Sequence, residues 1–320
     1  MNILVTGCCG FIGFHLTKNL CGNKKNKIFG IDNLNNYYDV RLKKARLNIL
    51  QKSNNFQFYK IDISNKKKLE TVFQKKRFKC IIHLAAQAGV RNSIIDPDKY
   101  FKSNILGFYN VLNLSRDLNI GHFIFSSTSS VYGNNKIVPF SENTNSDFPL
   151  SFYAATKKSN EVIAHSYSNI YKLPTTILRL FTVFGTYGRP DMAIHKFTKN
   201  IKNNNIINLY NDGKHYRDFT HIDKVTTVIE KLISKPPAGK IPFAIYNVAS
   251  GRKTRITTIK KMIEKSLNKK SKVKYSGFKK GDVFQTHANV KKIKNKLNLK
   301  SDINLQKNIK QFVDWYEKFY

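Results

Sequence analysis

Strand-like and helix-like segments alternate along the first half of this 320-residue chain, and this rhythm constrains the fold more than any other feature. Short aliphatic runs predict strands at Asn2–Thr6, Lys27–Asp32, Phe56–Ile61, Cys80–Ala85, His122–Ser127 and Thr175–Phe181. Amphipathic stretches predict helices at Phe11–Leu20, Val40–Lys52, Lys66–Lys76, Pro97–Leu118 and Phe152–Tyr171. Such alternation builds right-handed crossovers, so we expect an α/β fold with a doubly wound parallel sheet. Ligands of these sheets bind at the carboxyl ends of the strands.

A glycine-rich loop, Gly7-Cys-Cys-Gly10-Phe-Ile-Gly13, joins the first expected strand to the first expected helix. Glycines allow the backbone to approach a pyrophosphate, and the N-terminus of the helix stabilises its negative charge. Glycine also suits a purely structural turn. However, Asp32 ends the second strand, where a carboxylate accepts bonds from an adenosine ribose and repels a 2′-phosphate. The pattern therefore predicts that the chain binds NAD rather than NADP.

Tyr153 and Lys157 stand four residues apart on an expected helix, so their side chains share one face. A lysine ammonium beside a phenol lowers the pKa of the phenol and makes it a usable base. This pair is common by itself, but Ser126, Ser127 and Thr128 end the preceding strand and could share the proton of a substrate hydroxyl. The glycine loop, the hydroxyl cluster and the Tyr153/Lys157 pair, in that order along the chain, form a specific set.

The rhythm weakens after Gly185, where the turn-rich segment Gly185–Pro190 interrupts it. Beyond this break we expect one strand at Ala244–Val248 and helices at Met192–Lys202, Ile222–Ser234, Ile256–Leu267 and Ile303–Phe319. A polar stretch separates the first two of these helices. This change predicts a Rossmann-like, NAD-binding domain over residues 1–185, with later sheet elements from about 215–250. A smaller, interleaved α/β domain is expected over residues 186–320.

The chain carries 56 Lys and Arg against 20 Asp and Glu, a formal net charge of +36. A polyanionic partner, such as nucleic acid or an anionic membrane, is one interpretation of this excess. The basic residues are spread along the chain and often accompanied by Asn, which favours solvated faces instead. We therefore expect neither specific nucleic-acid binding nor a membrane partner.

The apolar runs, the cysteines and the histidines of the sequence indicate the compartment of the protein and whether it binds a metal. The run Cys80–Ala86 is far shorter than the ~20 residues that span a membrane, and Met1 leads directly into a strand without a signal-peptide pattern. The four cysteines form no CxxC pair, and the eight histidines show no metal-ligand spacing. We therefore expect a soluble, cytoplasmic protein without a metal site, in which His83 is a core histidine.

Several longer stretches carry a family resemblance. They are GIDNLNNYYDVRLKKAR (Gly30–Arg46), HLAAQAGVRNS (His83–Ser93), FYAATKKSNE (Phe152–Glu161), RLFTVFGTYGRPDM (Arg179–Met192) and RDFTHID (Arg217–Asp223). From Met1 to about Val290 the chain resembles the extended short-chain dehydrogenase/reductase family. Within that family it is most similar to the nucleotide-sugar epimerases, and among these to the UDP-glucuronate 4-epimerases.

The resemblance implies roles for individual residues. It makes Tyr153 the catalytic base, Lys157 its partner on the nicotinamide ribose, and Thr128 the group that bonds the sugar 4-hydroxyl. NAD binding is implied for Gly7, Gly10, Phe11, Ile12, Gly13, Asp32, Asn33, Asp62, Ile63, Leu84, Ala85, Ala86, Gln87, Tyr153 and Lys157. Binding of the UDP-sugar is implied for Arg91, Ser127, Thr128, Thr182, Arg189, Arg217 and Asp282, with the smaller domain holding the nucleotide.

The implied reaction is 4-epimerisation of a UDP-hexuronic acid through a transient 4-keto sugar, an isomerase activity that uses NAD without net oxidation and serves polysaccharide biosynthesis. Relatives that dehydrate or decarboxylate their substrates usually carry an acidic residue after the catalytic Thr, whereas Ser129 follows Thr128 here. UDP-glucose 4-epimerase is an alternative, and a non-catalytic NAD-binding regulator is another. The resemblance also implies a homodimer in which Pro97–Leu118 and Phe152–Tyr171 form a four-helix bundle across the two-fold axis.

Two stretches depart from the family pattern. Cys8 and Cys9 occupy the glycine loop where small residues such as alanine are usual, which could crowd the turn or add redox sensitivity. Lys280 precedes Gly281 and Asp282 where proline is common, which weakens the assignment of the nucleotide contacts there.

Overall fold

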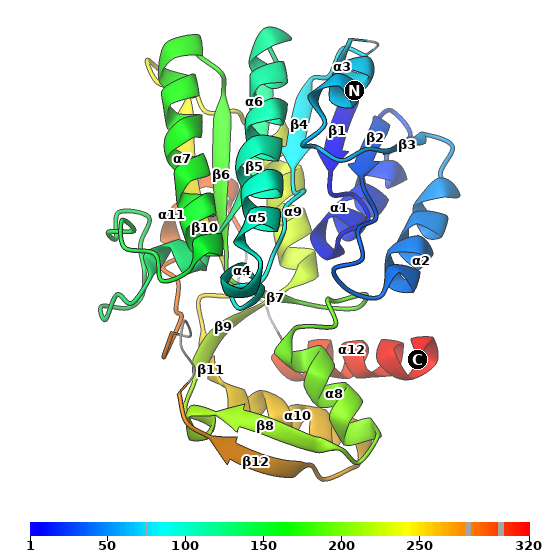
Figure 1. Cartoon of the computed structure of the whole chain (residues 1–320), viewed down its shortest axis with the longest axis vertical. Coiled ribbons are helices and arrows are strands. Elements are labelled where there is room, and N and C mark those ends of the chain that lie inside the picture. The colour runs from blue at the N-terminus through cyan, green and yellow to red at the C-terminus, as the bar shows by residue number, and fades with distance from the viewer. Residues whose placement is uncertain (75, 279–282, 300–303) are drawn as a thin grey trace.

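The computed structural model describes residues 1–74, 76–278, 283–299 and 304–320, and its larger part is built on a seven-stranded parallel sheet (Figure 1). The strand order is β10-β6-β5-β4-β1-β2-β3. These strands are β1 (Asn2–Thr6), β2 (Lys27–Asp32), β3 (Phe56–Lys60), β4 (Cys80–His83), β5 (His122–Thr128), β6 (Thr175–Leu180) and β10 (Phe243–Val248). The order reverses between β1 and β4, and a crevice at such a reversal is where doubly wound sheets bind ligands.

Helices cover both faces of this sheet because successive strand residues point to opposite sides. Ile3 and Val5 belong to one apolar cluster and Leu4 to the other. The first cluster is completed by α1 (Phe11–Gly22), α2 (Val40–Gln51), α9 (Ile222–Ile233) and α11 (Lys291–Leu297). The second is completed by α3 (Lys66–Phe73), α6 (Gly107–Asp117) and α7 (Phe152–Tyr171). The result is the expected three-layer α/β architecture.

The helix expected over Pro97–Leu118 is not continuous. After α4 (Asn92–Ile95), the chain forms α5 (Pro97–Tyr100), a π-helical turn η1 (Phe101–Leu106) and only then α6. A π-helical turn widens the helix and commonly marks a functional site. Here it directs the buried side chain of Asn104 toward the loop that follows β4.

The smaller part of the molecule contains two short sheets. One has the order β11 (Lys253–Arg255), β9 (Tyr216–His221), β7 (Thr182–Phe184), and the other pairs β12 (Lys272–Ser276) with β8 (Ile206–Tyr210). Its apolar cluster is shared by α8 (Ala193–Lys202), α10 (Ile256–Leu267) and α12 (Leu305–Phe319). Short 3-10 turns complete the chain at η2 (Ser129–Tyr132) and η3 (Asn211–Gly213). The stretch expected to be merely polar before α9 therefore holds β8 and β9.

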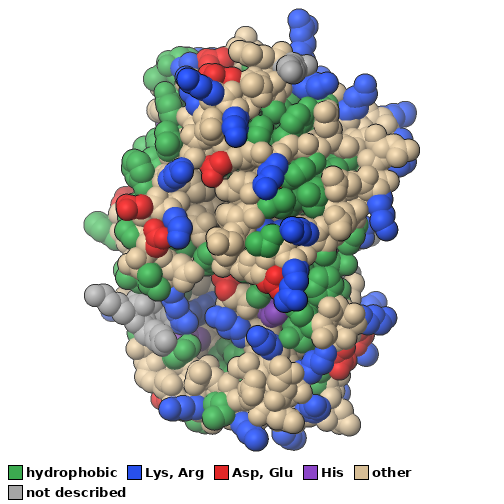
Figure 2. Space-filling view, turned by 45° about the vertical axis from the view of Figure 1, so that its right-hand side comes forward, with side chains coloured by type: hydrophobic (Ala, Val, Ile, Leu, Met, Phe, Trp, Pro, Cys, Tyr) green, Lys and Arg blue, Asp and Glu red, His purple; other side chains and the backbone are tan. Residues whose placement is uncertain are grey.

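The surface reflects the composition of the chain. Lys and Arg side chains are spread over the face shown in Figure 2, with Asp and Glu between them, so the positive charge is distributed over that face. Within the described residues, no helix is long and apolar enough to cross a membrane.

Candidate active site

The glycine loop lies at the reversal of the strand order, between the ends of β1 and β4. Gly7 has a positive φ of 73°, and a Cβ atom there would lie 2.7 Å from the backbone nitrogen of Ala85. A Cβ atom on Gly13 would lie 2.0 Å from the carbonyl oxygen of Gly7. The N-cap residue of α1, Gly10, provides no side-chain hydrogen bond to the first turn. This helix N-terminus without a side-chain cap follows a turn in which the side chains of Cys8 and Cys9 are buried, and such a site fits the pyrophosphate of a dinucleotide.

Asp32, at the end of β2, holds the glycine loop through hydrogen bonds to the backbone. Its Oδ2 accepts a hydrogen bond from the N–H of Cys9 at 3.0 Å, and its Oδ1 accepts one from the N–H of Leu34 at 2.8 Å. Next to it, the Asn33 side chain donates to Asp62 at 3.0 Å. The carboxylate of Asp32 thus organises the glycine loop from the end of β2, the strand end at which dinucleotide-binding sheets of this type hold an adenosine ribose.

The loop after β4 approaches the glycine loop from the other side. The N–H groups of Leu84 and Ala85 donate to the backbone and the hydroxyl oxygen of Thr6, at 3.1 and 3.2 Å. Asn104 exchanges two hydrogen bonds with the backbone of Gln87, at 2.8 and 3.0 Å, and donates to Thr156 of α7 at 3.1 Å. The sequence gives no sign of this link, because it depends on the π-helical turn.

His83 ends β4 beneath this loop. It is buried, contacts the hydroxyl of Thr6 through Nδ1 at 2.9 Å and stacks on Phe123 and Phe125. Burial, assisted by repulsion from the charge of Lys157, lowers its pKa to about 3. It is therefore a neutral core histidine, as expected, rather than an acid of the site.

The predicted catalytic residues meet at the carboxyl end of β5. Tyr153, at the start of α7, lies beside Thr128, the last residue of β5, whose hydroxyl acts to lower the pKa of the phenol and donates to Ser130 at 3.2 Å. Lys157 is buried one turn further along α7, donates to the carbonyl oxygen of Ser126 at 2.9 Å and lies 4.6 Å from the ring centre of Phe125. The structure thus brings the base, the hydroxyl and the lysine to one place.

The electrostatics of Tyr153 differ from the expectation. Burial raises its pKa, although the positive charge of Arg189 and the hydrogen bond with Thr128 act in the opposite direction. Burial also lowers the pKa of Lys157 to about 7, against the attraction of Glu161. The expected net lowering of the phenol pKa is therefore wrong for the protein alone, because desolvation of the phenolate outweighs the neighbouring positive charge.

Thr182 and Arg189 line one cavity with Phe11, the first residue of α1. The Nε of Arg189 donates to Asp191 at 3.0 Å, and the hydroxyl of Tyr37 reaches the same carboxylate at 3.4 Å. Arg189 also acts electrostatically on Tyr153. These contacts place Thr182 and Arg189 between the cofactor cradle and the smaller part of the molecule.

Ser127, Arg91 and Arg217, also predicted to bind substrate, are not among the residues that line this cavity. Ser127 points away from Thr128, and its hydroxyl donates to Glu161. The guanidinium of Arg91 stacks 4.8 Å from the ring centre of Tyr210, which belongs to the smaller part. Arg217 of β9 donates to the carbonyl oxygens of Tyr216 and Phe284 at 2.8 and 3.2 Å. Asp282 and Lys280 lie outside the described residues.

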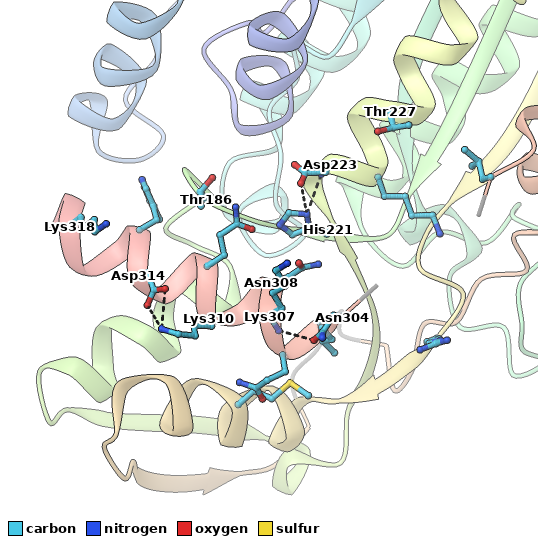
Figure 3. A pocket seen from close by; sticks show the side chains of 18 of the residues that line it. Thr186, His221, Asp223, Thr227, Asn304, Lys307, Asn308, Lys310, Asp314 and Lys318 are labelled. Carbon is cyan, nitrogen blue, oxygen red and sulfur yellow. Dashed lines mark hydrogen bonds and ion pairs between the residues drawn. The ribbon is translucent and has the colours of Figure 1, made fainter. Parts of the chain in front are cut away.

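A larger hollow lies away from these residues, between α9, α10 and α12 (Figure 3). In it the Nδ1 atom of His221 lies 3.3 Å from the carboxylate of Asp223, and Lys310 and Asp314 form an ion pair at 2.9 Å. None of the described residues predicted for the site lines this hollow. In the part of the chain that the structure describes, no three His, Cys, Asp or Glu residues are placed to hold a metal ion.

The fold and these residues define a dinucleotide-binding enzyme of the short-chain dehydrogenase/reductase class. Residues 4–312 match the family described as GDP-mannose 4,6 dehydratase, so the chain belongs to this family of extended short-chain dehydrogenases/reductases. The predictions of the family and of the fold class are therefore confirmed.

Within this family, the chain is similar to several nucleotide-sugar epimerases. The chain is 41% identical over 313 residues to a UDP-glucuronate 4-epimerase of Thermodesulfobacterium geofontis, covering 98% of this chain and 95% of the relative. It is 32% identical to UDP-glucuronic acid 4-epimerase of Bacillus cereus in complex with UDP-glucuronic acid and NAD, with a TM-score of 0.92 and full coverage of both chains. It is 29% identical to UDP-glucose 4-epimerase of Thermotoga maritima with UDP-glucose, with a TM-score of 0.90 over 100% of this chain and 99% of the other.

Proposed function

We propose that this protein is an NAD-dependent isomerase that inverts C4 of a UDP-hexuronic acid, converting UDP-glucuronate to UDP-galacturonate. The observation that carries the proposal is the meeting of Thr128, Tyr153 and Lys157 beside an uncapped glycine cradle. The similarity to UDP-glucuronate 4-epimerases supports the choice of substrate. When bound, NAD supplies a reversible hydride acceptor for C4, so no net oxidation occurs.

The residues of the chain perform the proton transfer and the positioning. The phenolic oxygen of Tyr153 takes the proton of the C4 hydroxyl, and the hydroxyl of Thr128, which lies beside the phenol, orients that group. Lys157 is held on the carbonyl of Ser126, from which its ammonium stabilises the phenolate. After the 4-keto sugar has turned, Tyr153 returns the proton to O4, and return of the hydride to the opposite face of C4 inverts the configuration there.

The carboxylate of the substrate requires its own partners, because a 4-keto hexuronate is a β-keto acid that can lose CO₂. Thr182 and Arg189 share a cavity beside the cradle and supply a hydroxyl and a cation for this group. Ser129, after Thr128, provides no acid for dehydration, and Glu161 and Asp191 are both engaged by arginines. We therefore favour epimerisation over the dehydration that gives the family its description.

UDP-glucose is the second candidate substrate, since a UDP-glucose 4-epimerase shares this fold at a TM-score of 0.90. Incubation with UDP-glucuronate and UDP-glucose in parallel, followed by anion-exchange separation, distinguishes the two. We expect UDP-galacturonate as the main product, with little UDP-galactose. Efficient conversion of UDP-glucose alone would replace the proposal, and inactivity toward both sugars would favour a non-catalytic NAD-binding role.

We also propose that the protein is a homodimer. Large apolar side chains are exposed on the helical layer of α4 to α7: Ile95 is 80% exposed, Ile170 64%, Val162 59% and Phe101 55%. Val162 and Ile170 are eight residues apart on α7 and so share a face. Light scattering after size exclusion should show a dimer. The variant Phe101→Glu/Val162→Lys should elute as a monomer, and a dimer that survives this change would contradict the assignment of the face.

The cytoplasm is the proposed compartment. The four cysteines are all buried free thiols, which suits a reducing environment.

A further inference from the structure

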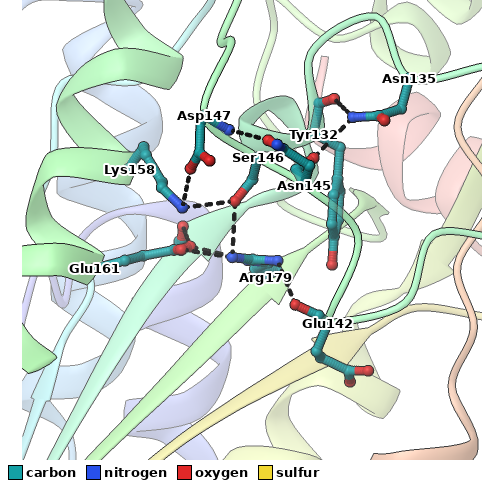
Figure 4. A network of polar contacts seen from close by, with 10 residues as sticks. Tyr132, Asn135, Glu142, Asn145, Ser146, Asp147, Lys158, Glu161 and Arg179 are labelled. Atoms are coloured by element: carbon teal, nitrogen blue, oxygen red, sulfur yellow. Dashed lines mark hydrogen bonds and ion pairs between the residues drawn. The ribbon is translucent and has the colours of Figure 1, made fainter.

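A buried ion pair lies behind the catalytic residues and has no part in the proposed chemistry. Glu161 follows Lys157 by one turn of α7, and Arg179 lies on β6 (Figure 4). The guanidinium donates to the two carboxylate oxygens at 2.7 and 3.1 Å, and both side chains are 3% exposed. Buried pairs lose much hydration and can often be replaced by apolar residues without loss of stability. Stability alone is therefore a weak explanation for this pair.

The first contact of interest joins Glu161 to the end of β5. The hydroxyl of Ser127 donates to Glu161 Oε1, and Ser127 stands opposite Arg179 in the register of β5 and β6. Its neighbours on either side serve the site, because the carbonyl of Ser126 holds Lys157 and Thr128 lies beside Tyr153. A shift of Ser127 would therefore move both supports of the catalytic pair.

The second effect of interest is electrostatic. Burial favours the neutral amine of Lys157, and the negative charge of Glu161 opposes it. Tyr153 and Glu161 lie one turn before and one turn after Lys157 on α7, and His83 faces Lys157 from β4. Arg179, on β6, lies behind Glu161. His83 stays neutral, with its pKa near 3, and Arg179 pairs with the carboxylate of Glu161. Among the described residues, Glu161 supplies the negative charge that acts on the Lys157 ammonium.

The same network reaches the segment that connects Thr128 with Tyr153 in sequence. Arg179 donates to the hydroxyl of Ser146 and to the carbonyl of Glu142, both at 3.3 Å. Lys158 donates to Ser146 at 2.7 Å and pairs with Asp147 at 3.2 Å, as Figure 4 shows. The ion pair thus anchors residues 142–147 to the sheet and to α7.

We propose that Glu161, held by Arg179, is a positioning residue of the active site. It fixes the end of β5 through Ser127 and supplies the negative charge that faces the Lys157 ammonium. The inference rests on the proposed function for the role of Lys157, but the contacts of Glu161 do not depend on the identity of the sugar.

Two variants and a matched control test this assignment. Glu161→Gln keeps the size of the side chain and removes its charge, but it leaves Arg179 as an unpaired buried cation, which destabilises the fold. The double variant Glu161→Leu/Arg179→Met replaces both ions with apolar groups, a change that buried pairs commonly tolerate. The control is Glu264→Gln, which breaks the Lys260–Glu264 pair of α10, at 2.9 Å, away from the site.

The main measurement is the pH dependence of kcat/KM with UDP-glucuronate. Without Glu161 the pKa of Lys157 falls further, so the ammonium is lost at lower pH. The alkaline limb of the profile should therefore move down by roughly one pH unit in both variants. The control should keep both limbs. A purely structural role would instead lower kcat/KM at every pH by the same factor.

A second measurement does not need a substrate. The side-chain resonance of Lys157, assigned by comparison with Lys157→Arg, should titrate at lower pH in both variants than in the wild type. A folded double variant with an unshifted profile and an unshifted Lys157 titration would overturn the inference. A wild-type protein inactive on UDP-glucuronate would overturn the proposed function alone, because a shifted Lys157 titration would still support the role of Glu161.

Discussion

Gly13→Ala is the sharpest test of the dinucleotide cradle. A Cβ atom at this position lies 2.0 Å from the carbonyl oxygen of Gly7, 2.8 Å from its carbonyl carbon and 3.0 Å from the Cα atom of Cys8. All three atoms belong to the backbone, so no side chain can rotate to relieve the clash. To reach an ordinary separation of 3.4 Å, the oxygen and the methyl group must part by about 1.4 Å.

The size of the effect follows from this displacement. Forcing an extra methyl group into a packed interior costs about 1–3 kcal/mol of stability. A misplacement of about 1 Å in a binding geometry can lower turnover roughly 100-fold. Gly22, the last residue of α1, is the control: a Cβ atom there has no neighbour within 4 Å. Gly22→Ala should therefore stabilise the protein by up to about 1 kcal/mol, because Ala loses less backbone entropy in a helix.

Three measurements check the pair of variants: urea unfolding, calorimetric titration with NAD, and turnover of UDP-glucuronate. We expect Gly13→Ala to unfold at lower urea and to bind NAD at least about tenfold more weakly, which is a loss of 1.4 kcal/mol. Gly22→Ala should bind NAD as the wild type does. Equal NAD affinity and equal stability in the two variants would refute the placement of the pyrophosphate on this loop.

Further predictions concern the chemistry and the two ligands. Tyr153→Phe should lower kcat by about 10²–10⁴-fold while NAD titrations stay unchanged, and a near wild-type rate would exclude Tyr153 as the base. Asp32→Ala leaves two backbone N–H groups without their acceptor, so urea unfolding should show a loss of about 1–3 kcal/mol and NAD should bind more weakly. Thr182→Val should lower kcat/KM about tenfold for UDP-glucuronate but much less for UDP-glucose, because it removes a donor worth about 1.4 kcal/mol. Equal losses would show that Thr182 does not contact C6. Duplex DNA should be released at about physiological ionic strength in a salt titration, and sequence-selective binding that persists there would contradict distributed surface charge.

The central sheet was predictable because its signal is local. Buried parallel strands read as short aliphatic runs, and both β1 and β2 were expected with the bounds that they have. The smaller part gave a weaker signal. In β8 (Ile206–Tyr210) exposed and buried residues alternate within only five positions, and β11 has three residues. Such short, half-exposed strands are defined by their partners, and the expectation of a polar stretch was wrong for this reason.

The residues of the site also divide into those that local motifs predict and those that only tertiary packing brings together. The glycine loop and the pair Tyr153/Lys157 are local motifs, because their geometry needs only a turn or one helical face. Asn104 could not be found in this way, since a π-helical turn shifts the hydrogen-bond register without a change in the apolar pattern. Glu161 and Arg179 are 18 residues apart in sequence and on different elements, so only the packing of α7 on β6 brings them together.

The end of β5 explains why a polar network persists in this part of the interior. Successive strand residues face opposite sides, so Ser127 reaches Glu161 under α7 while Thr128 meets Tyr153 at the open edge. A slip of one residue in the pairing of β5 with β6 would exchange these two hydroxyls and leave Glu161 and Arg179 facing the wrong neighbours. An apolar pair at the same depth would have no directional bonds to lose in that slip, so packing alone would oppose it. The buried ions therefore link the register of the strand to the geometry of the base, and the same argument accounts for Ser127, which was expected at the substrate and instead bonds Glu161.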